Sequence, residues 1–208
     1  MNDKPYYSTY IQSLQNALEQ LTVTDLSGEL IGQESAFQSL VELSRSVQER
    51  GGRQFLCGNG ASAAFADHMA LDWTKNGKVT SLSFGTSALL SAVANDLGFN
   101  KTFAEPISWY GGKQDLLVAI SSSGNSPNIT EAIKTARTKN MTVVTFTGLR
   151  PDNRVRQMGD FNFYIQAHTY GIVECVHQVL LHVWLDQFMQ VEEWSIENFQ
   201  NMREHDSG

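Results

Sequence analysis

The sequence predicts an α/β fold: a three-layer α/β/α sandwich on a five-stranded, mostly parallel sheet, preceded by an N-terminal helical extension. Two observations predict it. Short apolar runs alternate with helical segments from residue 53 onward, which is typical of a parallel sheet between two helical layers. The run DLLVAIS at 115–121 is almost entirely apolar, as expected of a strand covered on both faces. We expect the extension at 1–50, the main domain at 51–192 and a C-terminal tail at 193–208.

The residues before the main domain are expected to form two amphipathic helices. Apolar side chains recur at three- and four-residue steps in a first stripe, made of Tyr10, Leu14, Leu18 and Leu21. A second stripe spans residues 37–47 and is followed by Gly51 and Gly52, which favour a helix stop. Two such helices ahead of the first strand predict an extension that packs on the main domain or on another subunit.

The main domain is expected to alternate strands with helices. Its strands are the apolar runs at 53–57, 79–84, 115–121, 142–147 and 161–166. The helices between and after them are expected at 61–75, 87–96, 126–140 and 171–190. Pro127 falls in the first turn of the third of these helices, where its missing N–H does no harm. No internal repeat or linker indicates a second domain.

Composition and charge exclude several classes of function. The 208 residues carry 15 Lys and Arg against 22 Asp and Glu, a net charge of -7, so no nucleic-acid partner is expected. The hydrophobic fraction of 41% excludes a disordered chain. No apolar stretch is long enough for a signal peptide or a membrane span, so no membrane partner is expected. Cys57 and Cys175 are too few for a disulfide framework and are expected to be reduced, in the core of a cytoplasmic protein.

The strongest local motif is the segment SSSGNSPN at 121–128, where a predicted strand ends and a helix begins. This edge of an open α/β sheet is where ligands bind. The free N–H groups of a helix start, a flexible glycine and four hydroxyls suit an anion, above all a phosphate. The hydroxyls belong to Ser121, Ser122, Ser123 and Ser126. The alternative is a polar loop in which Ser126 caps the helix.

The glycine-rich turn GNGASA at 58–63 raises the question of a nucleotide cofactor. It fits a loose form of the dinucleotide fingerprint, which also requires an acidic residue about 20 positions later. No carboxylate occurs from Val79 to Ala94, and the P-loop sequence GxxxxGK(S/T) is absent. We therefore expect no nucleotide cofactor and interpret the motif as a tight glycine turn.

Two helices carry groups that bind metals or exchange protons in other proteins. His68 and Asp72 are four residues apart, so they share one face of a helix. Such a pair can bind a metal ion, act as an acid–base pair or form an ordinary surface contact. The closing helix adds Glu174, His177 and His182 to an otherwise apolar segment. We interpret His177 as a buried structural histidine.

Taken in order, several segments resemble the sugar isomerase (SIS) domain family, and within it the phosphoheptose isomerases. The segments are GNGASA at 58–63, the helix with His68 and Asp72, AVANDLGFN at 92–100, AISSSGNSPNITEAIKTA at 119–136 and TVVTFTG at 142–148. The resemblance covers about residues 35–190 and implies a flavodoxin-like fold. It also implies a homotetramer with zinc at a subunit interface, which isomerises sedoheptulose 7-phosphate to D-glycero-D-manno-heptose 7-phosphate.

The resemblance assigns roles to individual residues. Substrate and phosphate contacts fall on Asn59, Gly60, Ser62, Asn95, Asp96, Ser121, Ser122, Ser123, Ser126 and Glu174. The metal ligands fall on His68, Asp72, Glu174 and His182, and proton transfer through an enediol falls on Asp72 and His182. Asp72 stands where the family usually has Glu, which shortens the reach of the acid–base group by one methylene. Glu174 stands where Gln is usual, which adds a charge that would tighten metal binding or change the preferred metal.

Two further departures concern the substrate. The segment TKNGK at 74–78 lacks the Arg usual there, and QAHTYGIVE at 166–174 is expected to bring His168 or Tyr170 toward the ligand. The alternative function is a non-catalytic SIS module, either a phosphosugar sensor or an assembly protein such as a replication-initiator partner. Relatives of that kind have lost metal-site side chains, whereas all four positions here carry a ligand-capable group. This difference favours an aldose–ketose isomerase.

Overall fold

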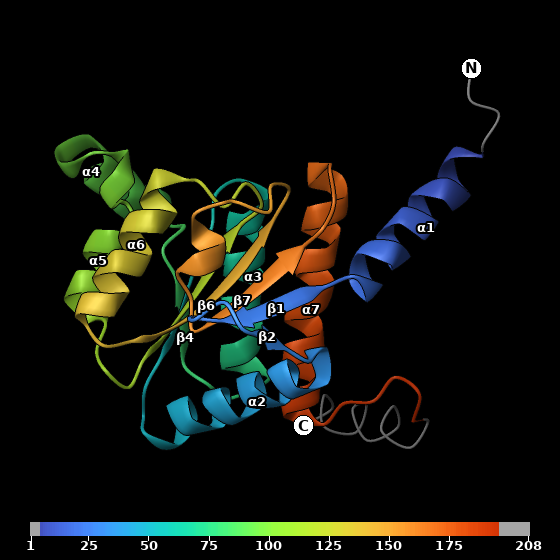
Figure 1. Cartoon of the computed structure of the whole chain (residues 1–208). Helices are drawn as coiled ribbons and strands as arrows, with labels where there is room; N and C mark the ends of the chain where they lie inside the picture. The colour runs from blue at the N-terminus through green and yellow to red at the C-terminus, as the bar shows by residue number, and fades with distance from the viewer. Residues whose placement is uncertain (1–4, 196–208) are drawn as a thin grey trace.

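The computed structural model describes residues 5–195, in which helices cover both faces of a single sheet (Figure 1). The predicted α/β sandwich is confirmed, but the sheet has seven strands rather than five, in the order β2-β1-β7-β6-β5-β3-β4. The expected strands pair in parallel and are β3 (Gln54–Cys57), β4 (Ser81–Ser83), β5 (Leu116–Ser121), β6 (Thr142–Gly148) and β7 (Phe161–Ile165). Their carboxyl ends therefore meet at one edge of the sheet, where ligands bind in folds of this class.

Two short antiparallel strands extend the sheet beyond β7, in a segment for which the sequence predicts helices alone. β1 (Thr22–Asp25) pairs with β7, and β2 (Leu30–Ile31) pairs with β1. In the turn between them the Asp25 carboxylate accepts hydrogen bonds from the backbone of Ser27 and Glu29, and Gly28 has a φ of +89°. β1 covers the edge of β7, which would otherwise be free to pair with another chain.

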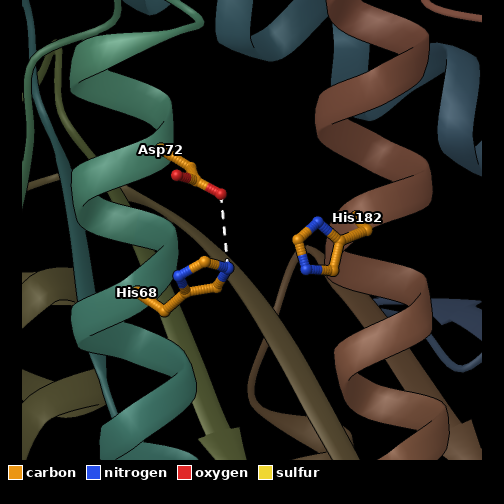
Figure 2. A group of neighbouring side chains, drawn as sticks. All are labelled: His68, Asp72 and His182. Atoms are coloured by element: carbon orange, nitrogen blue, oxygen red, sulfur yellow. Dashed lines mark ion pairs between the residues drawn. The ribbon is translucent and has the colours of Figure 1, made fainter.

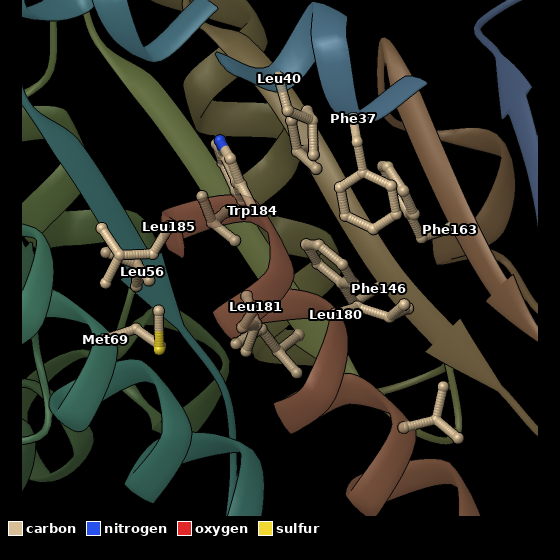
Figure 3. Close-up of a cluster of buried hydrophobic side chains, with 14 of the residues drawn as sticks. Phe37, Leu40, Leu56, Met69, Phe146, Phe163, Leu180, Leu181, Trp184 and Leu185 are labelled. Carbon is tan, nitrogen blue, oxygen red and sulfur yellow. The ribbon is translucent and has the colours of Figure 1, made fainter. Parts of the chain in front are cut away.

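Each face of the sheet packs against its own helices. One face is covered by α2 (Gln33–Glu49), α3 (Ala61–Lys75) and α7 (Tyr170–Met189), and the other by α4 (Ser87–Leu97), α5 (Ala104–Tyr110) and α6 (Pro127–Thr138). Figure 3 shows the first core, where Trp184 of α7 lies with Phe146 of β6 and Leu40 of α2. Along β5, Leu116, Val118 and Ile120 enter this core, and Leu117 and Ala119 enter the other. This two-residue alternation is that of a strand buried on both faces.

Helix α1 (Tyr6–Glu19) projects away from the rest of the molecule (Figure 1). Ala17 is the only buried residue in this helix, and Tyr6 and Tyr7 are 84% and 78% exposed. Tyr10 and Leu14 pack at the edge of the core beside α7. The predicted helix therefore forms, but it leaves much of its apolar surface uncovered within one chain.

Other expectations concern membranes, cysteines and the tail. Among the described residues, no helix combines the length and the apolar character that crossing a membrane requires. Cys57 is buried, and burial raises the pKa of its thiol to about 12, whereas Cys175 is exposed rather than buried. Of the predicted tail at 193–208, residues 196–208 lie outside the described part of the chain.

Candidate active site

The serine loop, residues 121–126, begins where β5 ends and leads directly into α6. The N–H of Gly124 donates to the carbonyl of Ser121 (2.9 Å), and Gly124 has a φ of +62°. Pro127, the first residue of α6, has no N–H, and the Ile129 N–H donates to the Asn128 side chain (3.1 Å), so the backbone N–H of Asn128 is the free donor of the first turn. The Ser126 hydroxyl makes no capping hydrogen bond, so it is available to a ligand. The loop thus combines hydroxyls with a free N–H donor at a helix start, which suits a phosphate.

A pocket of about 310 Å³ lies between the serine loop, the start of α3 and the start of α7, and we call it the serine pocket. It brings together eight of the residues predicted to contact substrate, namely Asn59, Gly60, Ser62, Ser121, Ser122, Ser123, Ser126 and Glu174. Tyr170 also lines the pocket, whereas His168 does not. Hydroxyl donors and one carboxylate therefore face the same space.

The glycine turn that leads into α3 is tied to α6 by a reciprocal pair of amides. Asn59 and Asn128 each donate to the other's side-chain oxygen at 2.9 Å, and Asn128 also donates to Thr102 Oγ1 at 3.2 Å. A side chain at Gly58 would overlap Ser62, so only glycine allows the turn to approach the helix this closely. The role of Asn128 is not visible in the sequence, because its partner is 69 residues away and no local spacing connects the two.

A second group of predicted site residues lies between α3 and α7 (Figure 2). His68 Nε2 is 3.3 Å from an oxygen of Asp72, and the His68 and His182 ring centroids are 5.4 Å apart. One ligand atom from each of these three residues lies within 4.8 Å of the other two. We call His68, Asp72 and His182 together the metal cluster. Two imidazole nitrogens and a carboxylate oxygen form a donor set that zinc accepts, at about 2.0–2.2 Å from the ion. The three residues thus offer nitrogen and oxygen donors of the kind zinc takes, close to one another, so they fit a zinc ion.

Glu174 does not join the metal cluster, so the four predicted ligands are only partly assembled within one chain. Glu174 lines the serine pocket, and His182 lies eight residues further along α7. This separation corresponds to about 12 Å along the helix axis, at ~1.5 Å per residue. Within one chain, a straight helix therefore places Glu174 at the serine pocket and His182 at the metal cluster.

Asp186, which was not among the residues predicted for the site, adds a carboxylate near the metal cluster. It lies one helical turn beyond His182 on α7, and the i,i+4 spacing is the signal that could have revealed it. Burial raises the pKa of Asp186, His182 opposes this effect, and the Asp72 and Glu193 carboxylates raise the pKa further. The cluster therefore lies in a region of concentrated negative charge, which favours a cation.

Asn95 and Asp96 do not reach the serine pocket of their own chain. They lie near the end of α4, both exposed, and Asn95 donates a hydrogen bond to Asp96 (2.8 Å). α4 belongs to the helical layer on the opposite face of the sheet from α3 and α7 (Figure 1). The predicted substrate contacts from these two residues are therefore absent within one chain.

Replacing Glu174 with glutamine is expected to tighten the binding of inorganic phosphate about tenfold. The carboxylate faces the serine pocket and repels an anion there, and removing a repulsion of about 1.4 kcal/mol gives this change. Calorimetric titration at neutral pH measures the Kd, and Glu42→Gln on the exposed side of α2 controls for the general loss of charge. Zinc affinity, measured by chelator competition, is expected to stay unchanged. Weaker phosphate binding together with loss of zinc would place Glu174 with the metal instead.

Comparison with known proteins identifies the family. The model of the SIS domain matches residues 9–148. A phosphoheptose isomerase of Helicobacter pylori (strain P12) is 33% identical over 153 residues, which are 70% of this chain and 79% of the relative. A phosphoheptose isomerase of Mycobacterium bovis is 35% identical over 156 residues, which are 69% of this chain and 79% of the relative.

Solved structures agree with these relatives. The phosphoheptose isomerase from Neisseria gonorrhoeae matches this fold with a TM-score of 0.76 and 28% sequence identity, over 88% of this chain and 95% of that one. The region matched by the SIS domain model, residues 9–148, contains the glycine turn, the serine loop and α3, which together build most of the serine pocket. The chain therefore belongs to the SIS domain family.

Proposed function

We propose that this protein is an aldose–ketose isomerase that converts sedoheptulose 7-phosphate to D-glycero-D-manno-heptose 7-phosphate. The relatives described above are phosphoheptose isomerases, which supports this reaction. The observation that carries the proposal is that the serine pocket lies at the start of α3 and α7 and the metal cluster lies further along the same two helices. Such an arrangement suits a substrate with its phosphate at one end and its reacting carbons at the other.

The phosphate is proposed to bind in the serine pocket. The serine-loop hydroxyls that reach the pocket and the free backbone N–H of Asn128 at the start of α6 donate to its oxygens. Along α3, His68 lies six residues beyond Ser62, a rise of about 9 Å. In a ketose 7-phosphate, four carbons separate C2 from C7, so the reacting carbons lie well away from the phosphate. The offset between pocket and cluster therefore favours a long sugar chain.

Proton transfer is proposed for Asp72 and His182. Asp72 removes the proton from C1 of the ketose while His182 donates a proton to the C2 carbonyl oxygen, which yields an enediol. Return of a proton to C2 and loss of the C1 hydroxyl proton complete the aldose, with each side chain alternating between acid and base. Zinc held by His68, Asp72 and His182 would supply positive charge that polarises the carbonyl. Positioning by the bound phosphate keeps the reacting carbons beside these groups.

We further propose that the active protein is a cytoplasmic homotetramer with its active sites at subunit interfaces. The uncovered apolar surface of α1 supports association, and so do the exposed side chains of Leu71 and Val183 on the helices of the metal cluster. At a subunit interface, Asn95 and Asp96, which do not reach the serine pocket of their own chain, would face the pocket of a neighbouring subunit. Free thiols at both cysteines agree with a reducing compartment.

An isomerisation assay tests the proposal directly. Purified protein is incubated with sedoheptulose 7-phosphate, and the aldose product is followed by NMR. We expect turnover that is lost on chelation and restored by zinc. Turnover that persists unchanged under chelation would contradict the role of zinc but not the reaction. Tight binding of the sugar phosphate without turnover in the zinc-loaded protein would instead support a phosphosugar sensor.

A further inference from the structure

Helix α7 carries groups from both parts of the site, and His177 lies between them and faces the sheet. Glu174, three residues earlier, lines the serine pocket, and His182, five residues later, belongs to the metal cluster. His177 is fully buried, as the sequence predicts, and its ring lies 6.1 Å from that of Phe146 in β6, measured between centroids. The histidine therefore contacts the strand that leads to the pocket edge.

A hydrogen bond joins His177 to the carboxyl end of β6. Nε2 lies 3.3 Å from the carbonyl oxygen of Thr147, and burial lowers the pKa of the imidazole to about 4. The ring is therefore neutral at neutral pH and carries a single N–H. Because a carbonyl oxygen only accepts, that N–H is on Nε2 and donates to Thr147.

A second hydrogen bond continues from this strand end into the serine loop. The N–H of Gly148, which follows Thr147, donates to the carbonyl of Ser122 (3.1 Å). Thr147 also lies opposite Ser121 in the parallel pairing of β5 and β6. A side chain at Gly148 would overlap Val173 of α7, so helix and strand end are in direct contact there. The two hydrogen bonds therefore link α7 to the serine loop through a short stretch of backbone.

Packing alone does not explain a histidine at this position. Its Nδ1 has no hydrogen-bond partner, and the hydroxyls of Thr147 and Ser122 are also buried without one. Native proteins keep few unpaired buried polar atoms, because each is costly. An apolar side chain of similar size would fill this space without that cost. The polar contact therefore points to a role in the site.

We propose that His177 is a positioning residue for the active site. It fixes the end of β6, and through Gly148 the serine loop, relative to α7. Because His182 is on the same helix, this contact sets the spacing between the bound phosphate and the proton-transferring side chains. The proposal rests on the function proposed above, since it needs a substrate that spans both parts of the site.

Two variants separate the hydrogen bond from the packing. His177→Met and His177→Gln place unbranched side chains of nearly equal size in the same space, but only the glutamine amide donates to Thr147. We expect His177→Met to raise both the KM for sedoheptulose 7-phosphate and the Kd for inorganic phosphate about tenfold, and His177→Gln to stay within about threefold of wild type. Leu180→Ala, which opens a cavity beneath the same helix, is expected to lower the Tm and leave both constants unchanged.

Equal KM and Kd values in the methionine variant and wild type would overturn the proposal, as would equal increases in both His177 variants. A measurement on the wild-type protein decides the matter if the methionine variant does not fold. With ¹⁵N-labelled histidine, we expect NMR to show His177 in the Nε2–H form, with ring signals that shift when inorganic phosphate binds. Signals that stay unmoved at saturating phosphate would contradict the link to the loop.

If the proposed isomerase function is wrong, the experiments give a result that differs from failure of the His177 proposal. A wild-type protein that binds inorganic phosphate but does not convert sedoheptulose 7-phosphate contradicts the isomerase. The phosphate Kd values of the two His177 variants still test the positioning contact in that case, because they do not depend on turnover.

Discussion

Replacing Asp72 with asparagine is expected to lower kcat on sedoheptulose 7-phosphate by about 10²–10⁴, the usual contribution of a proton-transferring group. Asparagine has nearly the same shape as aspartate but does not accept the carbon-bound proton. The Asp72 side chain is 20% exposed and its near contacts are His68 at 3.3 Å and Asn76 at 3.4 Å, so the fold does not depend on its charge. Steady-state kinetics measure the loss, and the Tm is expected to stay within a few degrees of wild type.

The Asp72 variant needs a control for metal binding, because the same carboxylate lies in the metal cluster. Zinc content is measured alongside kcat, and the assay is repeated at saturating zinc. If Asp72 carries the proton, added zinc leaves the activity low. Full recovery at saturating zinc would show that Asp72 is only a ligand. Glu42→Gln on the exposed side of α2 removes one charge elsewhere and is expected to keep full activity.

The parallel part of the sheet can be predicted because its strands are buried on both faces. β5 has six consecutive buried residues, and such a run has few other interpretations next to helical segments. β1 and β2 escape prediction for a physical reason. They have four and two residues, and only Val23 among them is buried, so no apolar period marks them. Their pairing is determined by the open edge of β7, which the local sequence does not contain.

The candidate site, like the sheet, is only partly predictable from the sequence. The serine loop and the His68–Asp72 pair can be predicted, since the loop follows a strand end and the pair has helical spacing. The approach of His182 to this pair depends on how α7 packs against α3, which no spacing along the chain determines. The separation of Glu174 from His182 follows from helix geometry, but their different environments appear only once the pocket is assembled.

Replacing Gly124 with alanine is expected to weaken the binding of inorganic phosphate at least about tenfold. Gly124 has a φ of +62°, which costs an alanine about 1–2 kcal/mol, and a methyl group there would overlap the Asn153 side chain. Asn153 cannot move aside easily, because it is 1% exposed and bonds to the backbone of Gly148, Arg150 and Arg156. The serine loop must therefore shift, and relief of the overlap adds about 1–3 kcal/mol.

Gly28→Ala provides the matched control for this variant. Gly28 also has a positive φ, +89°, but nothing lies within 4 Å of a methyl group there, and it is in the β1–β2 turn far from the serine pocket along the sheet. Both variants are expected to lose stability in thermal melts, whereas only Gly124→Ala loses phosphate binding in calorimetric titrations. Wild-type phosphate affinity in Gly124→Ala would mean that the anion is held elsewhere. Because both substitutions impose the same kind of backbone strain, a difference in phosphate affinity between them measures the dependence of the anion on the shape of the serine loop.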